Sequence, residues 1–371
     1  MNQGRIGFLD GLRGWGSVFV LLYHVFSDGL PIDKVTAARL PLLVPFNGQL
    51  AVMVFFVVSG FALCFRYLRD GRGDQLARIA AGRYFRLAIP IFVACLLVHL
   101  AMRAGLIDPL RRPPFIHFLN FDPTTWHLLR FSLFDVFFNY DYSRSYIGPL
   151  WTMSIELVGS YIVLLAVFVL RPWRARIVLL LVLAGLLALV SSGDMKLLAL
   201  FPLGAALADC FNRGWLDAIP RWLGLCIVAI GCVIPAILPY GIFAWALIAA
   251  PLLVIGSIAV PGIRAFLSNR LSTELGIVSF PLYLMHGPVI FLFGEPLVRA
   301  YPAYHIPIQF LTVLLSFAAA WPFIWINSRA IDASHYAGRL VAGLYSGAWE
   351  RRQRKSESVG NRQADDRRDV P

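Results

Sequence analysis

Charged residues are scarce in this sequence. Only 15% of the residues are charged, whereas 58% are hydrophobic and the mean hydropathy is +0.70. A soluble domain has an apolar share of about 45–50%, so the composition excludes an ordinary soluble protein. Nearly all of the basic residues are arginines at the ends of apolar runs or near the C-terminus. This placement is typical of membrane loops and headgroup contacts, so the net charge of +12 does not indicate a nucleic-acid partner.

Several motifs of soluble enzymes and metalloproteins are missing. No serine lies in a G-x-S-x-G elbow, which disfavours a Ser-His-Asp hydrolase. Glycine-rich phosphate loops and paired spacings such as H-E-x-x-H are also absent, so we predict no metal site. The five cysteines lie in or beside apolar segments without C-x-x-C spacing, which predicts neither a disulfide nor a zinc site. The first apolar run lacks a small-x-small cleavage site, so we expect no cleavable signal peptide.

What the sequence does contain is a series of apolar runs long enough to cross a bilayer. They predict an all-α, polytopic integral membrane protein with about ten transmembrane helices. The runs are 11–30, 48–67, 87–104, 146–170, 174–191, 195–212, 222–240, 242–260, 275–294 and 307–328. We expect residues 1–330 to form a transmembrane domain and the charged segment 331–371 to be a disordered cytoplasmic tail.

Arginines in the short loops predict the orientation. The segment 66–86 between the second and third runs is rich in arginine and should face the cytoplasm. Both termini are then cytoplasmic, and the protein is expected in the inner membrane of the cell. The long segment 105–145 is assigned to the other side although it carries arginines. Its many aromatic residues suggest that it lies on the membrane interface or folds over a cavity.

Three ionisable residues fall deep within apolar runs. At about 1.5 Å per residue, His24 lies roughly 16 Å beyond Arg13, His286 lies equally deep in the ninth run, and Glu156 lies roughly 15 Å deep in the fourth. Such groups are costly unless they face a cavity or each other, so a functional role is the default interpretation. The alternatives are a hydrogen bond between helices for either histidine and a protonated, structural carboxyl for Glu156.

Three shorter patterns have more than one interpretation. Asp28 follows His24 by one helical turn and either orients the imidazole or marks the water interface, which we favour. The Ser59-Gly60 pair in "FFVVSGF" is a small-residue patch where a helix or a ligand can approach closely. In "RYFR", Arg83 and Arg86 lie one helical turn apart. They form a fork suited to phosphate groups or are ordinary cytoplasmic arginines.

Together these motifs resemble acyltransferase family 3, a family of membrane acyltransferases. The family's motifs occur in order as "LDGLRG" with Arg13 and, after ten residues, His24; "FFVVSGF"; "RYFRLAIP"; "PLWTMSIE" with Glu156; and "YLMHGPV" with His286. The resemblance covers roughly residues 1–330. It implies a ten-helix core that moves an acyl group, usually acetyl, from cytosolic acyl-CoA to a hydroxyl of a carbohydrate, a lipid-linked glycan or another cell-envelope molecule. Acyl-CoA is then a co-substrate, membrane lipids surround the protein, and no cofactor is permanently bound.

The resemblance also implies roles for the deep ionisable residues. Acyl transfer to an alcohol needs a base for the hydroxyl proton and a donor for the tetrahedral oxyanion. His24 would be that base, or would carry the acyl group as a covalent acyl-imidazole. Glu156 would orient or stabilise an imidazolium, and His286 would position the acceptor.

Binding of the donor would fall to arginines at the cytoplasmic surface. Arg13, Arg83 and Arg86 would hold the CoA phosphates or the entry of the pantetheine arm. Asp10 would pair with an arginine in a mainly structural role, and Ser59 and Gly60 would line the pocket or support it.

Two other classes remain open from the sequence. A proton-coupled transporter uses the same intramembrane groups, but matched Gly/Pro-interrupted segments and two-half symmetry are not evident. A membrane-bound O-acyltransferase of the unrelated type also relies on a buried histidine. Turnover of acyl-CoA by the purified protein separates an enzyme from a transporter.

Overall fold

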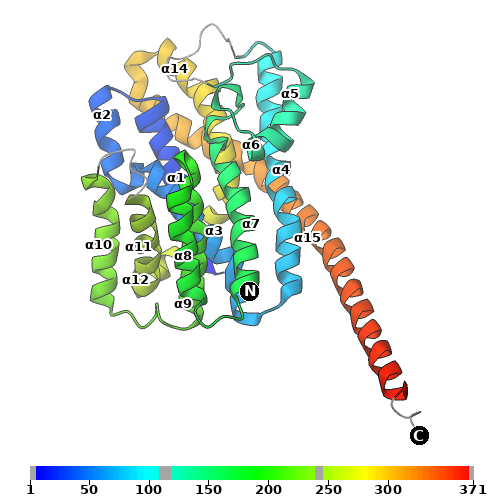
Figure 1. Ribbon diagram of the computed structural model, residues 1–371. Helices are drawn as coiled ribbons and strands as arrows, with labels where there is room; N and C mark the ends of the chain where they lie inside the picture. The colour runs from blue at the N-terminus through cyan, green and yellow to red at the C-terminus, as the bar shows by residue number, and fades with distance from the viewer. Residues whose placement is uncertain (1–5, 108–117, 239–244, 367–371) are drawn as a thin grey trace.

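The computed structural model describes residues 6–107, 118–238 and 245–366, and within them every regular element is helical. The helices stand side by side in one bundle, from which the end of the last helix projects (Figure 1). The principal helices are α1 Gly7–Tyr23, α2 Lys34–Arg39, α3 Gly48–Asp70, α4 Gly73–Arg103, α5 Thr125–Arg130, α6 Val136–Phe138, α7 Thr152–Leu170, α8 Arg176–Val190, α9 Leu200–Asn212, α10 Arg221–Ile237, α11 Ala246–Ala259, α12 Pro261–Leu267, α13 Arg270–Val289, α14 Glu295–Ala300 and α15 His305–Asp366.

The predicted helical class is correct, but the predicted count of ten membrane spans is not confirmed. Five helical segments of the described chain are long and apolar enough to cross a bilayer, and α11 with α12 makes a sixth if that pair, bent by 97°, is one span. The five are Gly48–Asp70, Gly73–Arg103, Gly148–Leu170, Arg270–Ala300 and Pro302–Val341. The apolar helices α8 and α10 have only 15 and 17 residues. An apolar run can be longer than the helix that it forms, because the run also includes apolar residues of the adjoining turns.

Helix α4 begins well before the apolar run that predicted it. The run began at residue 87, whereas the helix begins at Gly73 and therefore includes the arginine-rich sequence. Hydropathy misses this first half because its polar residues lower the average, although Ala, Leu and Arg all favour helix. Arg78, Arg83 and Arg86 are thus helical residues rather than loop residues.

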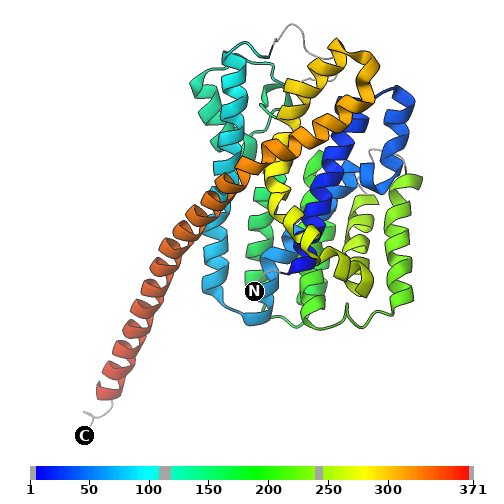
Figure 2. The same cartoon turned by 180° about the vertical axis from the view of Figure 1, so that it is seen from behind.

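Helix α15 packs along α4 and crosses the back of the bundle (Figure 2). Ser334 lies against Gly82 of α4, so the packed part of α15 extends past residue 330, where we expected the transmembrane domain to end. The structure describes the segment 331–366 as a continuation of α15, whereas the sequence predicted disorder from residue 331. Residues 367–371 of the predicted tail lie outside the described residues.

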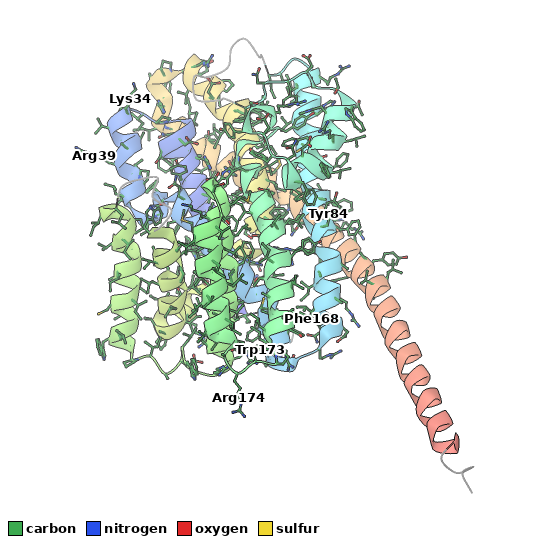
Figure 3. The ribbon with its side chains drawn as sticks, viewed as in Figure 1. Lys34, Arg39, Tyr84, Phe168, Trp173 and Arg174 are labelled. Carbon is green, nitrogen blue, oxygen red and sulfur yellow. The ribbon has the colours of Figure 1, made fainter. Side chains whose placement is uncertain are left out.

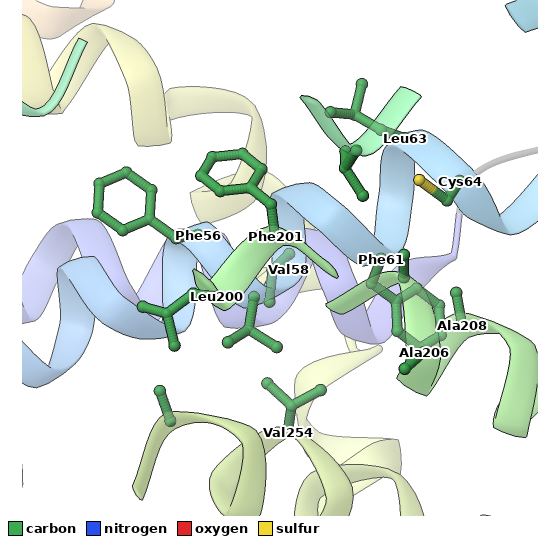
Figure 4. Close-up of a cluster of buried hydrophobic side chains, with 14 of the residues drawn as sticks. Phe56, Val58, Phe61, Leu63, Cys64, Leu200, Phe201, Ala206, Ala208 and Val254 are labelled. Carbon is green, nitrogen blue, oxygen red and sulfur yellow. The ribbon is translucent and has the colours of Figure 1, made fainter. Parts of the chain in front are cut away.

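The core of the bundle forms around α3, which packs closely against α9. A Cβ atom at Gly60 would lie 2.1 Å from the carbonyl oxygen of Phe201, so only glycine permits this helix separation. Figure 4 shows Phe56, Phe61 and Phe201 in the apolar cluster that fills this region. Gly60 is thus the point of close approach between α3 and α9.

Helix α1 is held against α13 by a similar close approach. A Cβ atom at Gly276 would lie 2.5 Å from the carbonyl oxygen of Asp10. Each of these two helices passes into a π-helical turn, His24–Gly29 after α1 and Ile290–Gly294 after α13. The two π turns contact each other. Because such turns reorient side chains and recur at functional sites, they draw attention to His24 and to the end of α13.

The bundle has two distinct ends. One end carries Lys34 and Arg39 and the other carries Trp173 and Arg174 (Figure 3). We call these the upper end and the lower end, as they lie in Figures 1 and 3. The start of α1, the last described turn of α15 and the turn between α3 and α4 all lie toward the lower end (Figure 1). The sequence predicts that this turn faces the cytoplasm, which stays a prediction.

Candidate active site

A cavity of about 260 Å³ opens between α1, α3 and α13 toward the upper end. We call it the upper cavity. His24, Asp28, Gln49, Trp151, Tyr283 and His286 are among the residues that line it. The structure therefore brings together the two histidines that the sequence singled out from different helices.

The two histidines lie next to each other in the lining of this cavity. Their ring centroids lie 5.1 Å apart. Nδ1 of His24 lies 2.8 Å from Oδ2 of Asp28, whose side chain is half exposed. From the sequence we favoured a place at the water interface for Asp28 over a contact with the imidazole, and the structure shows that contact. The carboxylate can only accept a hydrogen bond, so Nδ1 of His24 donates and Nε2 is left to accept a proton.

His286 is nearly fully buried, with 1% of its surface exposed. Its Nδ1 lies 3.1 Å from the carbonyl oxygen of Leu282, which also can only accept a hydrogen bond. Nδ1 therefore carries the proton in the neutral ring. Nε2 of His286 has no hydrogen-bond partner within the described residues. A buried acceptor without a partner is unfavourable, and a ligand hydroxyl in the cavity would satisfy it.

The segment 105–145 contributes to the upper cavity through Phe118 and Tyr142. The sequence predicts that this segment lies on the membrane interface or folds over a cavity. Short helices build it, with α5 and α6 at the upper end of the bundle (Figure 1). Arg111 and Arg112 of this segment lie outside the described residues.

A second cavity of about 320 Å³ lies below the first, and we call it the lower cavity. The three arginines predicted to bind the donor line it, and so do Glu156 and the two polar residues to which the sequence gave a supporting role. These residues are Asp10, Arg13, Ser59, Arg83, Arg86 and Glu156. The upper cavity thus contains the histidines, and the lower cavity contains the arginines.

Glu156 joins the arginines instead of the histidines. It forms an ion pair with Arg83, and its Oε1 accepts a hydrogen bond of 2.8 Å from Ser59 Oγ. Ser59 Oγ in turn lies 3.4 Å from Nη2 of Arg13. The proposed contact of Glu156 with an imidazole is therefore absent from this structure, within the described residues.

Arg83 is more deeply buried than a surface phosphate ligand. Only 5% of it is exposed, and besides Glu156 its Nε donates a hydrogen bond of 3.0 Å to Ser160 Oγ. Burying an arginine beside a carboxylate satisfies both charges, because neither can be solvated well in the bundle interior. This arrangement makes Arg83 well suited to holding α4 against α7.

A third cavity, of about 280 Å³, lies between α4 and α15 and adjoins the lower one. We call it the basic cavity because Arg78, Arg83, Arg86, His335 and Arg339 line it. Arg83 and Arg86 also line the lower cavity, so the two spaces share one wall.

Several of these residues were missed from the sequence. Tyr283 lines both the upper and the lower cavity, and its position three residues before His286 in a helix could have signalled a shared face. His335 and Arg339 were assigned to the predicted tail. Only the packing of α15 on α4 brings them to the basic cavity, and hydropathy does not reveal it.

One cavity of this helical membrane protein thus holds an oriented imidazole, and the next holds arginines. An imidazole can act as a general base, and arginines can bind an anionic donor from which a group is transferred. The chain belongs to acyltransferase family 3, whose model, described as an acyltransferase domain, matches residues 6–325. It is similar to the O-acetyltransferase PaAT-1 of Phomopsis amygdali, with 23% identity over 80% of this chain and 74% of that protein. No solved structure matches it. The protein is therefore an acyltransferase of the O-acetyltransferase-like kind, which favours the enzyme over the transporter.

Proposed function

We propose that the protein transfers an acyl group from acyl-CoA, which enters at the lower end, to a hydroxyl of a carbohydrate or other cell-envelope molecule in the upper cavity. The observation that carries this proposal is the adjacency of two chemically different cavities within one bundle. The printed name of the relative PaAT-1, an O-acetyltransferase, favours acetyl as the acyl group.

The proposed chemistry begins at His24. Its Nε2 removes the proton from the acceptor hydroxyl, because Asp28 holds Nδ1 and fixes the tautomer. The acceptor oxygen then forms a bond to the thioester carbonyl carbon, and the carbon–sulfur bond breaks. The CoA thiolate leaves and takes up the proton that His24 holds. Gln49 and Trp151 line the same cavity and carry N–H groups suited to the oxyanion that forms between these steps.

His286 is proposed to position the acceptor. Its Nε2 accepts a hydrogen bond from a second hydroxyl of the acceptor, which satisfies the buried atom. The centroid separation of 5.1 Å between the two rings lets neighbouring hydroxyls of one molecule reach both. A carbohydrate, which carries hydroxyls on adjacent carbons, meets this requirement better than a simple alcohol.

The CoA phosphates are proposed to lie in the basic cavity and at the lower end of the lower cavity. Arg86 lines both spaces, and Arg78, His335 and Arg339 add positive or protonatable groups around the first. Guanidinium groups bind phosphate oxygens with charge-assisted hydrogen bonds, often in pairs. Arg13 would contact the donor from the opposite wall. Arg83 would support this wall through Glu156.

The orientation forms part of the proposal. Acyl-CoA is cytosolic, so the lower end, with the start of α1 and the α3–α4 turn, would face the cytoplasm from the inner membrane. The acceptor would then reach the upper cavity from the opposite side.

Acyl-CoA turnover in membranes tests the proposal directly. Membranes that contain the full-length protein should release CoA from acetyl-CoA and acylate an envelope glycan. His24→Ala should lower the rate by about 10²–10⁴-fold, the usual contribution of a general base. Mass spectrometry of envelope polysaccharides from cells lacking the protein would identify the glycan that loses the acyl mass. Turnover by His24→Ala equal to that of the wild type would refute the role of His24.

A further inference from the structure

The upper and lower cavities share only two of the described residues that line them. These are Val52 on α3 and Tyr283 on α13. Val52 is partly buried, and 7% of Tyr283 is exposed. One valine and one tyrosine thus border both the cavity with the histidines and the cavity with the arginines.

The ring of Tyr283 is anchored at its hydroxyl. This hydroxyl donates a hydrogen bond to the carbonyl oxygen of Pro149 and lies 2.6 Å from Oγ1 of Thr152. Pro149 lines the upper cavity and Thr152 lines the lower one, so the anchor lies on the boundary itself. Two hydrogen bonds at one hydroxyl hold the ring in one position. The distance between this ring and Val52 is therefore set by the fold.

A donor held by the arginines must place its acyl carbon beside His24 in the other cavity. The acyl group then has to pass between Val52 and Tyr283. We propose that these two residues form a constriction that selects the acyl group by its width, favouring short chains. This inference rests on the proposed use of acyl-CoA, and it assigns specificity to residues that perform no step of the chemistry.

Changing Val52 alters the width without touching either histidine or any arginine. Val52→Ala should raise kcat/KM for butyryl-CoA relative to acetyl-CoA by about 10-fold or more, because one methylene in a closely fitting site changes discrimination by about 10–200-fold. Val52→Phe should lower the same ratio by a similar factor. Tyr283→Phe keeps the ring but removes its anchor, so it should shift the ratio in the direction of Val52→Ala and by less.

The measurement is a competition between acetyl-, propionyl- and butyryl-CoA in one sample of membranes that contain the full-length protein. Consumption of each thioester is followed by mass spectrometry, and membranes with His24→Ala give the background. Competition yields ratios of kcat/KM directly, so a smaller folded fraction cancels. If Val52→Phe fails to fold, Val52→Ala decides the question.

The matched control is Val54→Ala. Val54 is a buried valine on the same helix that lines neither cavity, so its truncation should leave the ratio unchanged. Selectivity that stays at the wild-type value in Val52→Ala, or that shifts equally in Val54→Ala, overturns the constriction. A wild-type protein that consumes no acyl-CoA would instead refute the proposed function, which is a distinguishable result.

Discussion

Nδ1 of His24 lies 2.8 Å from Oδ2 of Asp28, one helical turn further along the same element. The carboxylate thereby fixes which nitrogen of the imidazole carries a proton. It also compensates the positive charge that His24 would acquire in taking a proton from the acceptor. This contact comes from within one helical segment, so it needs no other helix to form.

Replacing Asp28 should therefore affect the rate more than the binding of the donor. In Asp28→Asn the amide can donate to Nδ1 and favour the wrong tautomer, so we expect kcat to fall by about 10–10³-fold, less than for a fully buried triad carboxylate. The KM for acetyl-CoA should stay near the wild-type value. Asp33→Asn is the matched control, since Asp33 is an exposed cap of α2 and asparagine also caps helices well. Wild-type kcat in Asp28→Asn would contradict the assigned role.

His286 should influence the acceptor side alone. His286→Ala removes the buried Nε2 that we assign to an acceptor hydroxyl, so transfer to the glycan should decrease while hydrolysis of acetyl-CoA by water continues. The measured quantity is the ratio of acylated glycan to released CoA in membranes, which should fall by about 10-fold, the equivalent of one hydrogen bond. Equal losses of both products would instead place His286 in the common chemistry with His24.

The sequence located depth along each helix better than the direction in which a side chain points. A rise of about 1.5 Å per residue is a property of every α-helix, so it placed His24 and His286 in one layer, and the structure brings them together. It placed Glu156 in that layer too, but the carboxylate faces Arg83 instead. Rotation of a helix about its axis is set by packing against neighbours, which a single sequence does not specify.

Hydropathy likewise predicted the apolar parts of the helices better than their polar parts. The first half of α4 and the continuation of α15 are helical but polar, so an average over apolar residues misses both. Their packing against each other creates the basic cavity, whose residues Arg78 and Arg339 were therefore not associated from the sequence. The family motifs, by contrast, gave the class of enzyme directly because they are local in the chain.

The ion pair of Arg83 and Glu156 should contribute to stability more than to donor binding. Glu156→Gln leaves a buried guanidinium without its counter-charge, which should lower the free energy of unfolding by about 3–5 kcal/mol. The double variant Arg83→Met with Glu156→Gln should regain part of this loss, because no unpaired charge remains. Heating in detergent followed by size-exclusion chromatography measures the folded fraction. If the stability losses of Arg83→Met and Glu156→Gln add up to the loss of the double variant, the two residues are not coupled.

Arg86 should have the opposite profile. It lines both the lower and the basic cavity, so Arg86→Ala should raise the KM for acetyl-CoA by about 10–10²-fold, the loss expected for one charge-assisted contact to phosphate. Thermal stability and kcat should change little. Arg174→Ala is a control because Arg174 is an exposed arginine at the lower end that lines neither cavity. A lower kcat at unchanged KM would move Arg86 to the transition state.

The sidedness of the bundle decides whether the donor can reach its proposed site. Lys34 and Arg174 are exposed at opposite ends, so cysteines at these positions report on opposite sides of the membrane (Figure 3). The five native cysteines are free and must first be replaced. With a membrane-impermeant maleimide, Lys34→Cys should label in intact cells, whereas Arg174→Cys should label only after the membrane is permeabilised. The reverse pattern would place the arginine-lined cavity on the side where acyl-CoA is absent, and transfer from the lower to the upper cavity would then be untenable.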